Sequence, residues 1–164
     1  MTSKLCILST VGPLGTDASP RGDDGPVVQE LNAETLMMPD WCGNNRLDSL
    51  RNIVEDGRVS LLFLVPGSNN VVRINRSAWL SASREIRQRF AKKDRLPATV
   101  VMIEIQEIYT QCARALMRAG TWEDAKPPAG LPTAGEILEQ ASAGDEGGIS
   151  YDNAWLGRAQ KTMW

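Results

Sequence analysis

The sequence predicts a mainly β protein: a small closed antiparallel β-barrel of about six strands, with short helices and a helical C-terminal tail. Three observations support this fold class. Short apolar runs recur between residues 4 and 108, turn residues separate them, and one amphipathic helical segment interrupts them. At 164 residues the chain has the length of one ordinary domain and can bury its own core.

The first two strands are expected to form a hairpin. Residues 4–10 are an apolar run, residues 12–15 make a turn, and residues 16–21 resume as a strand. In residues 19–24 the proline cannot donate a ladder hydrogen bond and the glycine permits a bulge, so we expect Arg21 at a kink in the strand. A kinked strand can present a side chain to a ligand, and a plain edge-strand loop fits the same residues.

A second hairpin is expected from residues 27–31 and 35–38, around a turn at residues 32–34. Pro39 and Asp40 end this hairpin just before the helical segment.

The helical segment from Gly43 to Gly57 has the features of an anion site. Asn44 and Asn45 are good N-cap residues, and the free N–H groups and positive dipole end of a helix start attract a phosphate. Arg46 stands in the expected first turn, where an acidic residue is favoured. This arginine therefore either has no role there or faces a negatively charged ligand. Arg51 is a further candidate to face a ligand, because the core-facing side of the helix would carry Leu47, Leu50, Ile53 and Val54.

Two more strands follow the helix. Residues 59–65 are a continuous apolar run, so we expect both faces of this strand to be buried, and residues 71–80 are expected to return antiparallel after a turn. The period of two places Arg73 and Asn75 together on one face of the return strand. A solvated face explains this pair, and so does a set of donors for a phosphate or a carbonyl-rich ring.

The rest of the chain supplies one strand and several helices. Residues 84–93 predict a basic helix, 98–108 the last long strand, and 110–119 a helix. A proline-rich linker from residue 126 separates a barrel domain, 1–126, from a tail, 127–164. The tail has a capping box at Thr133 and Glu136 and an aromatic last segment, which we expect to dock on the barrel or on a second subunit.

Composition excludes several classes of function. The net charge of −2 argues against non-specific nucleic-acid binding, and no apolar run has the length of a membrane span or a signal-peptide core, so a cytoplasmic protein is expected. Three widely spaced cysteines support neither a disulfide framework nor a zinc site. Because the chain has no histidine, a Ser-His-Asp triad, a Cys-His nucleophile and a His-ligated metal are excluded. Chemistry must rest on carboxylates, arginines, backbone groups or a bound cofactor.

Five motifs in order along nearly the whole chain carry a family resemblance. The chain resembles the pyridoxamine 5′-phosphate oxidase-related FMN-binding proteins, and more narrowly their bacterial branch of small flavoproteins. The motifs are Ser19–Asp23, Pro39-Asp40 with Gly43–Ile53, Leu61–Gly67, Arg73–Asn75 and Cys112–Leu116.

The resemblance implies a split β-barrel homodimer that holds two FMN molecules at the subunit interface. Arg21, Asn44, Asn45 and Arg46 would bind the phosphate, with Arg51 as a further candidate. Asp40 would lie near the ribityl chain or the ring edge, and Arg73 and Asn75 would come from a neighbouring strand. Cys112–Arg114 or the tail tryptophans could close the site from the other subunit. No catalytic residue and no metal site is assigned.

The chain also departs from the family pattern. The family usually has a helical segment before the first strand, so the chain is expected to be shortened at its start. Arg76 replaces a glycine after the strand motif, and Trp41 and Cys42 replace polar loop residues.

Several functions remain open from the sequence. The first is an FMN-dependent oxidoreductase that acts on an unidentified small molecule, with pyridoxamine phosphate itself disfavoured because a second basic cluster is missing. The second is an FMN carrier, store or sensor without turnover. A deazaflavin or heme ligand is a third, and the lack of histidine argues against heme. The remaining alternative is a barrel whose arginines are ordinary surface charges.

Overall fold

The structure is a computed structural model, and it describes residues 2–43, 46–123 and 126–163. The chain divides into two units, Met1–Glu123 and Asp124–Trp164. The first unit contains an antiparallel sheet with three short helices, and the second contains two helices. The three stretches that the structure describes contain no helix with the length and apolar character needed to span a membrane.

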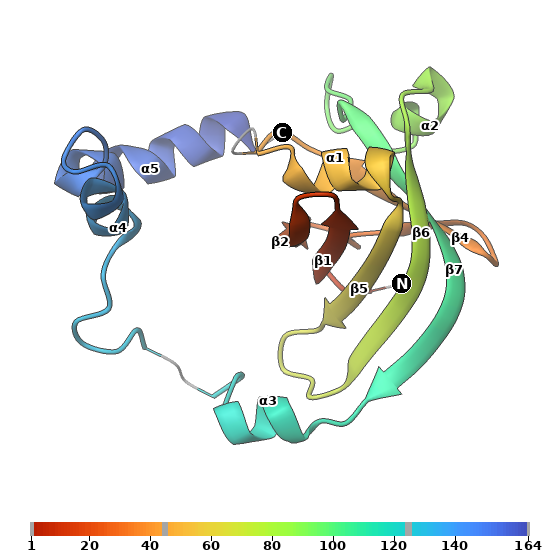
Figure 1. The fold of residues 1–164 in the computed structure, drawn as a ribbon, viewed down its shortest axis with the longest axis horizontal. Helices are drawn as coiled ribbons and strands as arrows, with labels where there is room; N and C mark the ends of the chain where they lie inside the picture. The colour runs from red at the N-terminus through yellow and green to blue at the C-terminus, as the bar shows by residue number, and fades with distance from the viewer. Residues whose placement is uncertain (1, 44–45, 124–125, 164) are drawn as a thin grey trace. The chain divides into compact units, whose positions relative to one another are not determined.

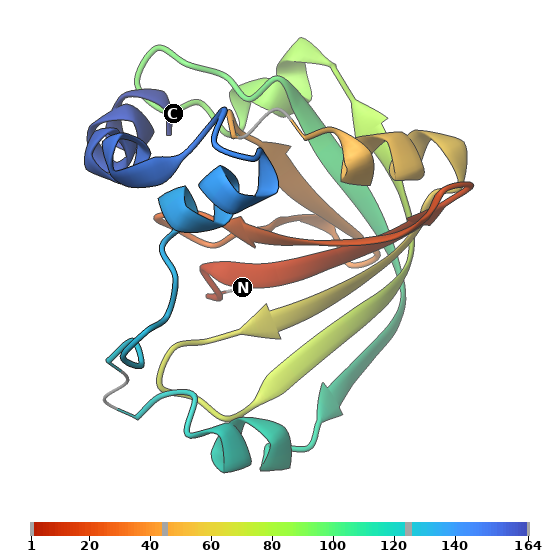
Figure 2. The same cartoon turned by 60° about the vertical axis from the view of Figure 1, so that its left-hand side comes forward.

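Seven strands form one antiparallel sheet in the order β2-β1-β5-β6-β7-β4-β3 (Figure 1). The mainly β prediction is confirmed, although the count of six is one short. The sheet is strongly curved but not closed, because its outermost strands, β2 and β3, do not pair with each other (Figure 2). The strands are β1 (Leu5–Gly12), β2 (Gly15–Gly22), β3 (Gln29–Asn32), β4 (Thr35–Asp40), β5 (Arg58–Leu64), β6 (Val71–Ser81) and β7 (Thr99–Gln111).

The core lies on the inner face of the curved sheet. Alternate residues of each central strand are buried there, which is the period of two that a half-buried strand requires. The largest of these side chains include Leu8, Leu36, Leu61, Phe63, Ile74 and Ile103. A smaller cluster on the outer face joins Met37 and Met102 to Phe90 and the partly buried Ile86, near helix α2 (Arg84–Gln88).

The prediction that a kink at Arg21 interrupts the pairing of β2 is wrong. Pairing between β1 and β2 runs without a shift from Leu5 opposite Gly22 to Gly12 opposite Gly15. Pro20 fits this regular strand because β2 is an edge strand, where a missing N–H group is tolerated. The register shifts lie instead between β3 and β4 and beside Asn75 of β6.

Helix α1 (Asp48–Glu55) begins later than the sequence predicted. Arg46 therefore precedes the helix, and the acidic residue of the first turn is Asp48, the type that the helix dipole favours. The predicted core face is also partly wrong: Ile53 is buried, but Leu47 is 50% and Val54 71% exposed. Polar bonds to the β1–β2 hairpin set the helix rotation, because Ser49 donates to Asp17 and Asn52 donates to Thr10.

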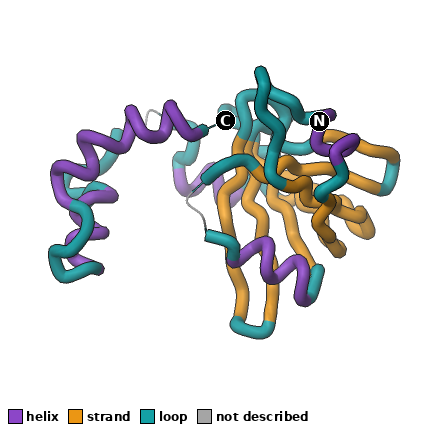
Figure 3. The backbone as a smooth tube through the Cα atoms, turned by 90° about the horizontal axis from the view of Figure 1, so that it is seen from above, coloured by secondary structure: helices purple, strands orange, loops and turns teal. Residues whose placement is uncertain are grey.

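The remaining helices are α3 (Arg114–Ala119), α4 (Ala134–Ala141) and α5 (Gly148–Thr162). The capping box predicted at the start of α4 is confirmed, because the Glu136 N–H donates to Thr133 Oγ1 and the Thr133 N–H donates to Glu136. Figure 3 shows α4 and α5 as successive helices joined by a loop. Ile137, Ile149 and Trp155 remain at least half exposed in this unit, and docking on the barrel or on a second subunit stays a prediction.

Candidate functional site

Arg21 and Asp40 meet across the open side of the sheet. Nη1 of Arg21 on β2 lies 3.5 Å from Oδ1 of Asp40, the last residue of β4. These strands are not neighbours: β2 is one edge of the sheet, and β4 is next to the other edge. The ion pair therefore spans the open seam between the two edges, with both side chains about four-fifths buried at 22% and 17% exposure.

Both residues of this pair lie on the inner face of the sheet. Arg21 is directly opposite Cys6, which is fully buried, and Asp40 is directly opposite Thr99. Directly opposite residues of antiparallel strands share a face. Burial raises the pKa of Asp40 above its usual value, and the Arg21 guanidinium opposes that rise only in part. Burial likewise raises the pKa of the Cys6 thiol to about 12, against a smaller opposing effect of Arg21.

Two buried polar atoms beside this pair lack a hydrogen-bond partner within the described part of the chain. They are Nε of Arg21 and Oγ1 of Thr99. Such atoms are rare in native proteins, and each usually signals a bound water, an ion or a ligand. Arg21 and Thr99 can therefore each form a further hydrogen bond at this end of the seam.

A second polar cluster continues the seam beyond Arg21. Asp23 accepts a hydrogen bond from Trp41 Nε1 at 3.2 Å. Lys92 pairs with Asp23 and with Asp24, and its ammonium group lies 5.7 Å from the centre of the Trp41 ring. These contacts join the end of β2, the end of β4 and the loop after α2, so they hold the seam together without a backbone ladder.

Arg73 and Asn75 lie together, as predicted, but on the outer face of the sheet. Arg73 is directly opposite Leu62, which stands opposite Ile7, whereas Arg21 shares its row with Cys6 on the inner face. The structure thus brings Arg21 and Asp40 together, and Arg73 and Asn75 together, on opposite faces of one sheet.

The outer pair belongs to a small polar network over β5, β6 and β7. Asn75 donates to Glu107 at 3.1 Å and accepts from Ser60 at 2.7 Å. Arg73 Nη1 lies 3.4 Å from Gln111 Oε1, and its Nε is the third buried polar atom without a partner among the described residues. Arg73, like Arg21, can therefore donate one more hydrogen bond from its Nε.

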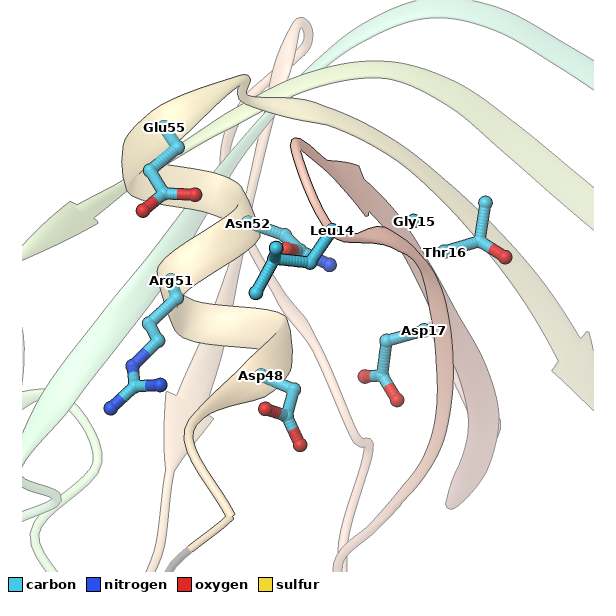
Figure 4. A pocket seen from close by; sticks show the side chains of 8 residues that line it. All are labelled: Leu14, Gly15, Thr16, Asp17, Asp48, Arg51, Asn52 and Glu55. Carbon is cyan, nitrogen blue, oxygen red and sulfur yellow. The ribbon is translucent and has the colours of Figure 1, made fainter.

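Arg51 lies in acidic surroundings that do not suit a phosphate. It lines a cavity of about 370 Å³ between α1 and the β1–β2 hairpin, together with Asp17, Asp48 and Glu55. Figure 4 shows the carboxylates of Asp48 and Asp17 facing each other across this cavity. Three carboxylates that line the same cavity would repel an anion.

The predicted site at the start of the helix also included Arg46, Asn44 and Asn45. Arg46 is exposed in the segment before α1. Asn44 and Asn45 lie outside the described residues. Within the described ranges, no three Cys, Asp or Glu residues are grouped as a metal site would need.

Sequence reasoning missed Thr99, Asp23 and Lys92. Thr99 was inside the predicted last strand, and its alternation with Val101 could have placed it on the core face. No sequence signal pairs Thr99 with Asp40, or Asp23 with Lys92, because these contacts depend on how the sheet curls.

Comparisons with known proteins agree with this architecture. A single-substitution variant of HupZ from Group A Streptococcus superimposes with a TM-score of 0.55 at 14% identity, over 66% of this chain and 90% of that one. HupZ itself gives a TM-score of 0.53 at 14% identity, over 65% and 84%. A candidate pyridoxamine 5′-phosphate oxidase from Lactobacillus delbrueckii gives 0.50 at 20% identity, over 65% and 84%.

At these identities the structural likenesses show the fold, and they support the split β-barrel class. No curated protein sequence matches the chain. The model of one protein family, described as pyridoxamine 5′-phosphate oxidase, matches residues 2–112, which is more than half of the sequence. The chain therefore belongs to the pyridoxamine 5′-phosphate oxidase family.

Proposed function

We propose that the protein binds FMN and uses it as an oxidoreductase on a small molecule. The observation that carries the proposal is the half-satisfied guanidinium of Arg21, with its buried Nε unpartnered, in a chain of this family. An arginine with an unpartnered Nε–H group, next to the strand end that leads to α1, suits a phosphate monoester. The unpartnered Nε atom of Arg21 supports the fit of this site to a phosphate group, because a phosphate oxygen would supply the missing acceptor.

In this proposal Arg21 holds the phosphate, and Arg46 adds a second positive charge from the segment before α1. Asn44 and Asn45 stay predicted contributors from the same segment. Arg51 is left out, because the cavity that it lines is also lined by the carboxylates of Asp17, Asp48 and Glu55.

Arg73 and Asn75 are proposed to serve the flavin of a second subunit. They face outward, away from the seam, so a homodimer would bring them to a partner's site more readily than to their own. The unpartnered Nε of Arg73 supports this, because a ring carbonyl of the flavin is an acceptor of the kind that it lacks. The exposed Tyr109 beside Arg73 gives the same face an aromatic surface that a subunit contact can cover.

FMN, when bound, supplies reversible acceptance of a hydride or of electrons. The residues of this chain then bind the phosphate, orient the ring and shield it from water. The proposal assigns binding and orientation to these residues, and it leaves both the catalytic base and the substrate unnamed.

The direct test is the visible spectrum of the purified full-length protein, followed by titration of the apoprotein with FMN. We expect a yellow protein, or uptake of FMN in about one equivalent per chain. Arg21→Ala should weaken FMN binding by about tenfold or more, since a hydrogen bond to a charged group contributes roughly 1.5–3 kcal/mol. Arg58→Ala is the matched control, because Arg58 is an exposed strand arginine paired with Asp56. A colourless protein that takes up no FMN would overturn the proposal.

Turnover is tested separately, because a carrier or sensor would share every binding residue. Bound FMN should be reduced by a nicotinamide donor and re-oxidised by oxygen or another acceptor. Bound FMN that undergoes neither step at a useful rate would favour the carrier function and overturn the oxidoreductase part.

A further inference from the structure

The polar groups around Asp40 are incompletely satisfied. Arg21 Nε and Thr99 Oγ1 are buried without partners in the part of the chain that the structure describes, and both flank Asp40 on the inner face. The contact of Asp40 with Arg21 is a long one, at 3.5 Å. Because each unpaired buried polar group costs stability, three under-used groups at one place indicate that something else completes the arrangement.

The geometry of the guanidinium group shows which side is left for a ligand. An arginine donates in a rigid planar fork, and the edge formed by Nε and Nη2 can bind two oxygens of one phosphate. Asp40 contacts Nη1, which is not on that edge. The ion pair therefore occupies one corner of the group, and the Nε atom on the opposite edge has no partner.

The two strands also differ in how firmly they are held. Asp40 is the last residue of β4, which pairs with the central strand β7. The preceding residues of β4, Met37, Met38 and Pro39, are buried. Arg21 comes from an edge strand that pairs only with β1. A long arginine side chain loses much conformational freedom when it is fixed, so a firmly held carboxylate can order it before a ligand arrives.

We propose that Asp40 is a positioning residue for the phosphate site. It holds Nη1 of Arg21 across the open seam, so that the Nε–Nη2 edge is presented to two oxygens of the FMN phosphate. This inference rests on the proposed function, and it changes the predicted role of Asp40 from a contact of the ribityl chain or ring edge to one that acts through Arg21. The raised pKa of Asp40 agrees with a carboxylate whose burial only Arg21 offsets.

Three variants of the full-length apoprotein, titrated with FMN, test the role of Asp40. Asp40→Ala removes the oxygen that holds Arg21, so FMN affinity should fall by about tenfold. Asp40→Asn keeps an acceptor oxygen and should restore affinity to within about threefold of wild type. Asp40→Val also lacks the oxygen and should lose FMN affinity to the same extent. Because valine is favoured in strands, this variant serves as the test if the alanine variant folds poorly. Asp56→Ala is the matched control, because Asp56 holds an exposed arginine at the surface.

A double-mutant cycle shows whether Asp40 acts through Arg21. Positioning predicts that Asp40→Ala causes no further loss of FMN affinity once Arg21 is replaced by alanine, whereas independent contributions would add. Tighter FMN binding by Asp40→Ala would mean that the carboxylate repels the phosphate, and equal binding would mean that it has no role in the site. Either result would overturn the inference. Additive losses in the cycle would also overturn it, as would failure of Asp40→Asn to restore binding.

These outcomes can be told apart from failure of the proposed function. If wild type does not bind FMN, both proposals fall together. If wild type binds FMN and loses affinity on Arg21→Ala, but Asp40→Ala and Asp40→Val bind like wild type, only the positioning role falls.

Discussion

The guanidinium carbon of Arg73 on β6 lies 5.4 Å from the centre of the Tyr109 ring, directly opposite it on β7. A cation over an aromatic ring at this distance is attracted to the ring face. This contact orders Arg73 on the outer face of the sheet, while its Nε remains without a partner among the described residues. Arg73 is thus an ordered hydrogen-bond donor on the outer face, in the same way that Arg21 is an ordered donor at the seam.

Replacing Arg73 should weaken FMN binding without unfolding the protein. Arg73→Ala removes the donor and the contact with Tyr109, and we expect FMN affinity to fall by about tenfold, while Arg73→Lys recovers only part because it lacks the planar fork. Flavin fluorescence quenching measures the affinity, and thermal unfolding checks the fold. Arg58→Ala, which changes an exposed arginine of β5, should bind FMN like wild type. Unchanged affinity in Arg73→Ala would remove Arg73 from the site.

The three cysteines should differ sharply in reactivity. Cys6 is buried and its thiol has a pKa of about 12, so its reactive thiolate is scarce, whereas Cys42 and Cys112 are exposed. We expect two thiols to react quickly with a thiol reagent in the native protein, and the third only after denaturant is added. Mass spectrometry of the labelled protein identifies the sites. Rapid labelling of Cys6 without denaturant would contradict the buried position of β1.

The stability of the protein should carry a pH dependence from Asp40. Burial raises the pKa of this carboxyl in the folded state, so the folded protein binds the proton more tightly than the unfolded chain. The resulting stabilisation is complete below the unfolded pKa and is lost as the pH rises through the folded pKa.

Urea unfolding of wild type and Asp40→Asn at a series of pH values measures this effect. The free energy of unfolding of wild type minus that of the variant should fall as the pH rises from about 3 to about 7. A difference that instead rises with pH would mean that the ion pair with Arg21 outweighs the cost of burying the carboxylate.

The helix pair of the C-terminal unit should depend on one glycine and not on another. A Cβ atom at Gly135 would lie 2.3 Å from the carbonyl oxygen of Gly148, so Gly135→Ala must push α4 and α5 apart. Among the described residues, no atom apart from those of the neighbouring residues and the backbone of α5 lies within 4 Å of a Cβ atom at Gly157. Gly157→Ala should therefore favour the helix by about 0.5–1 kcal/mol. Hydrogen exchange of the amides of α4 and α5 measures both effects. Equal protection in the two variants would argue against the close contact.

The strands could be predicted from the sequence because their signals are local. Apolar alternation and turn residues lie within a few positions of each other, and they placed β1, β2, β5, β6 and β7 to within a few residues. The capping box of Thr133 and Glu136 is local in the same way, because both of its hydrogen bonds join residues three apart. The start of α1 was harder to place, because no side-chain cap marks it and packing against the β1–β2 hairpin decides which side of the helix is buried.

The sequence by itself determined the fold class, the family motifs and the pairing of Arg73 with Asn75, since alternation within one strand fixes which of its residues share a face. Only the tertiary structure decided that Arg21 lies on the opposite face from Arg73 and meets Asp40 across the seam. Arg21 and Asp40 lie on two strands that are not neighbours, and their contact depends on the register of every strand between them and on the curvature of the whole sheet.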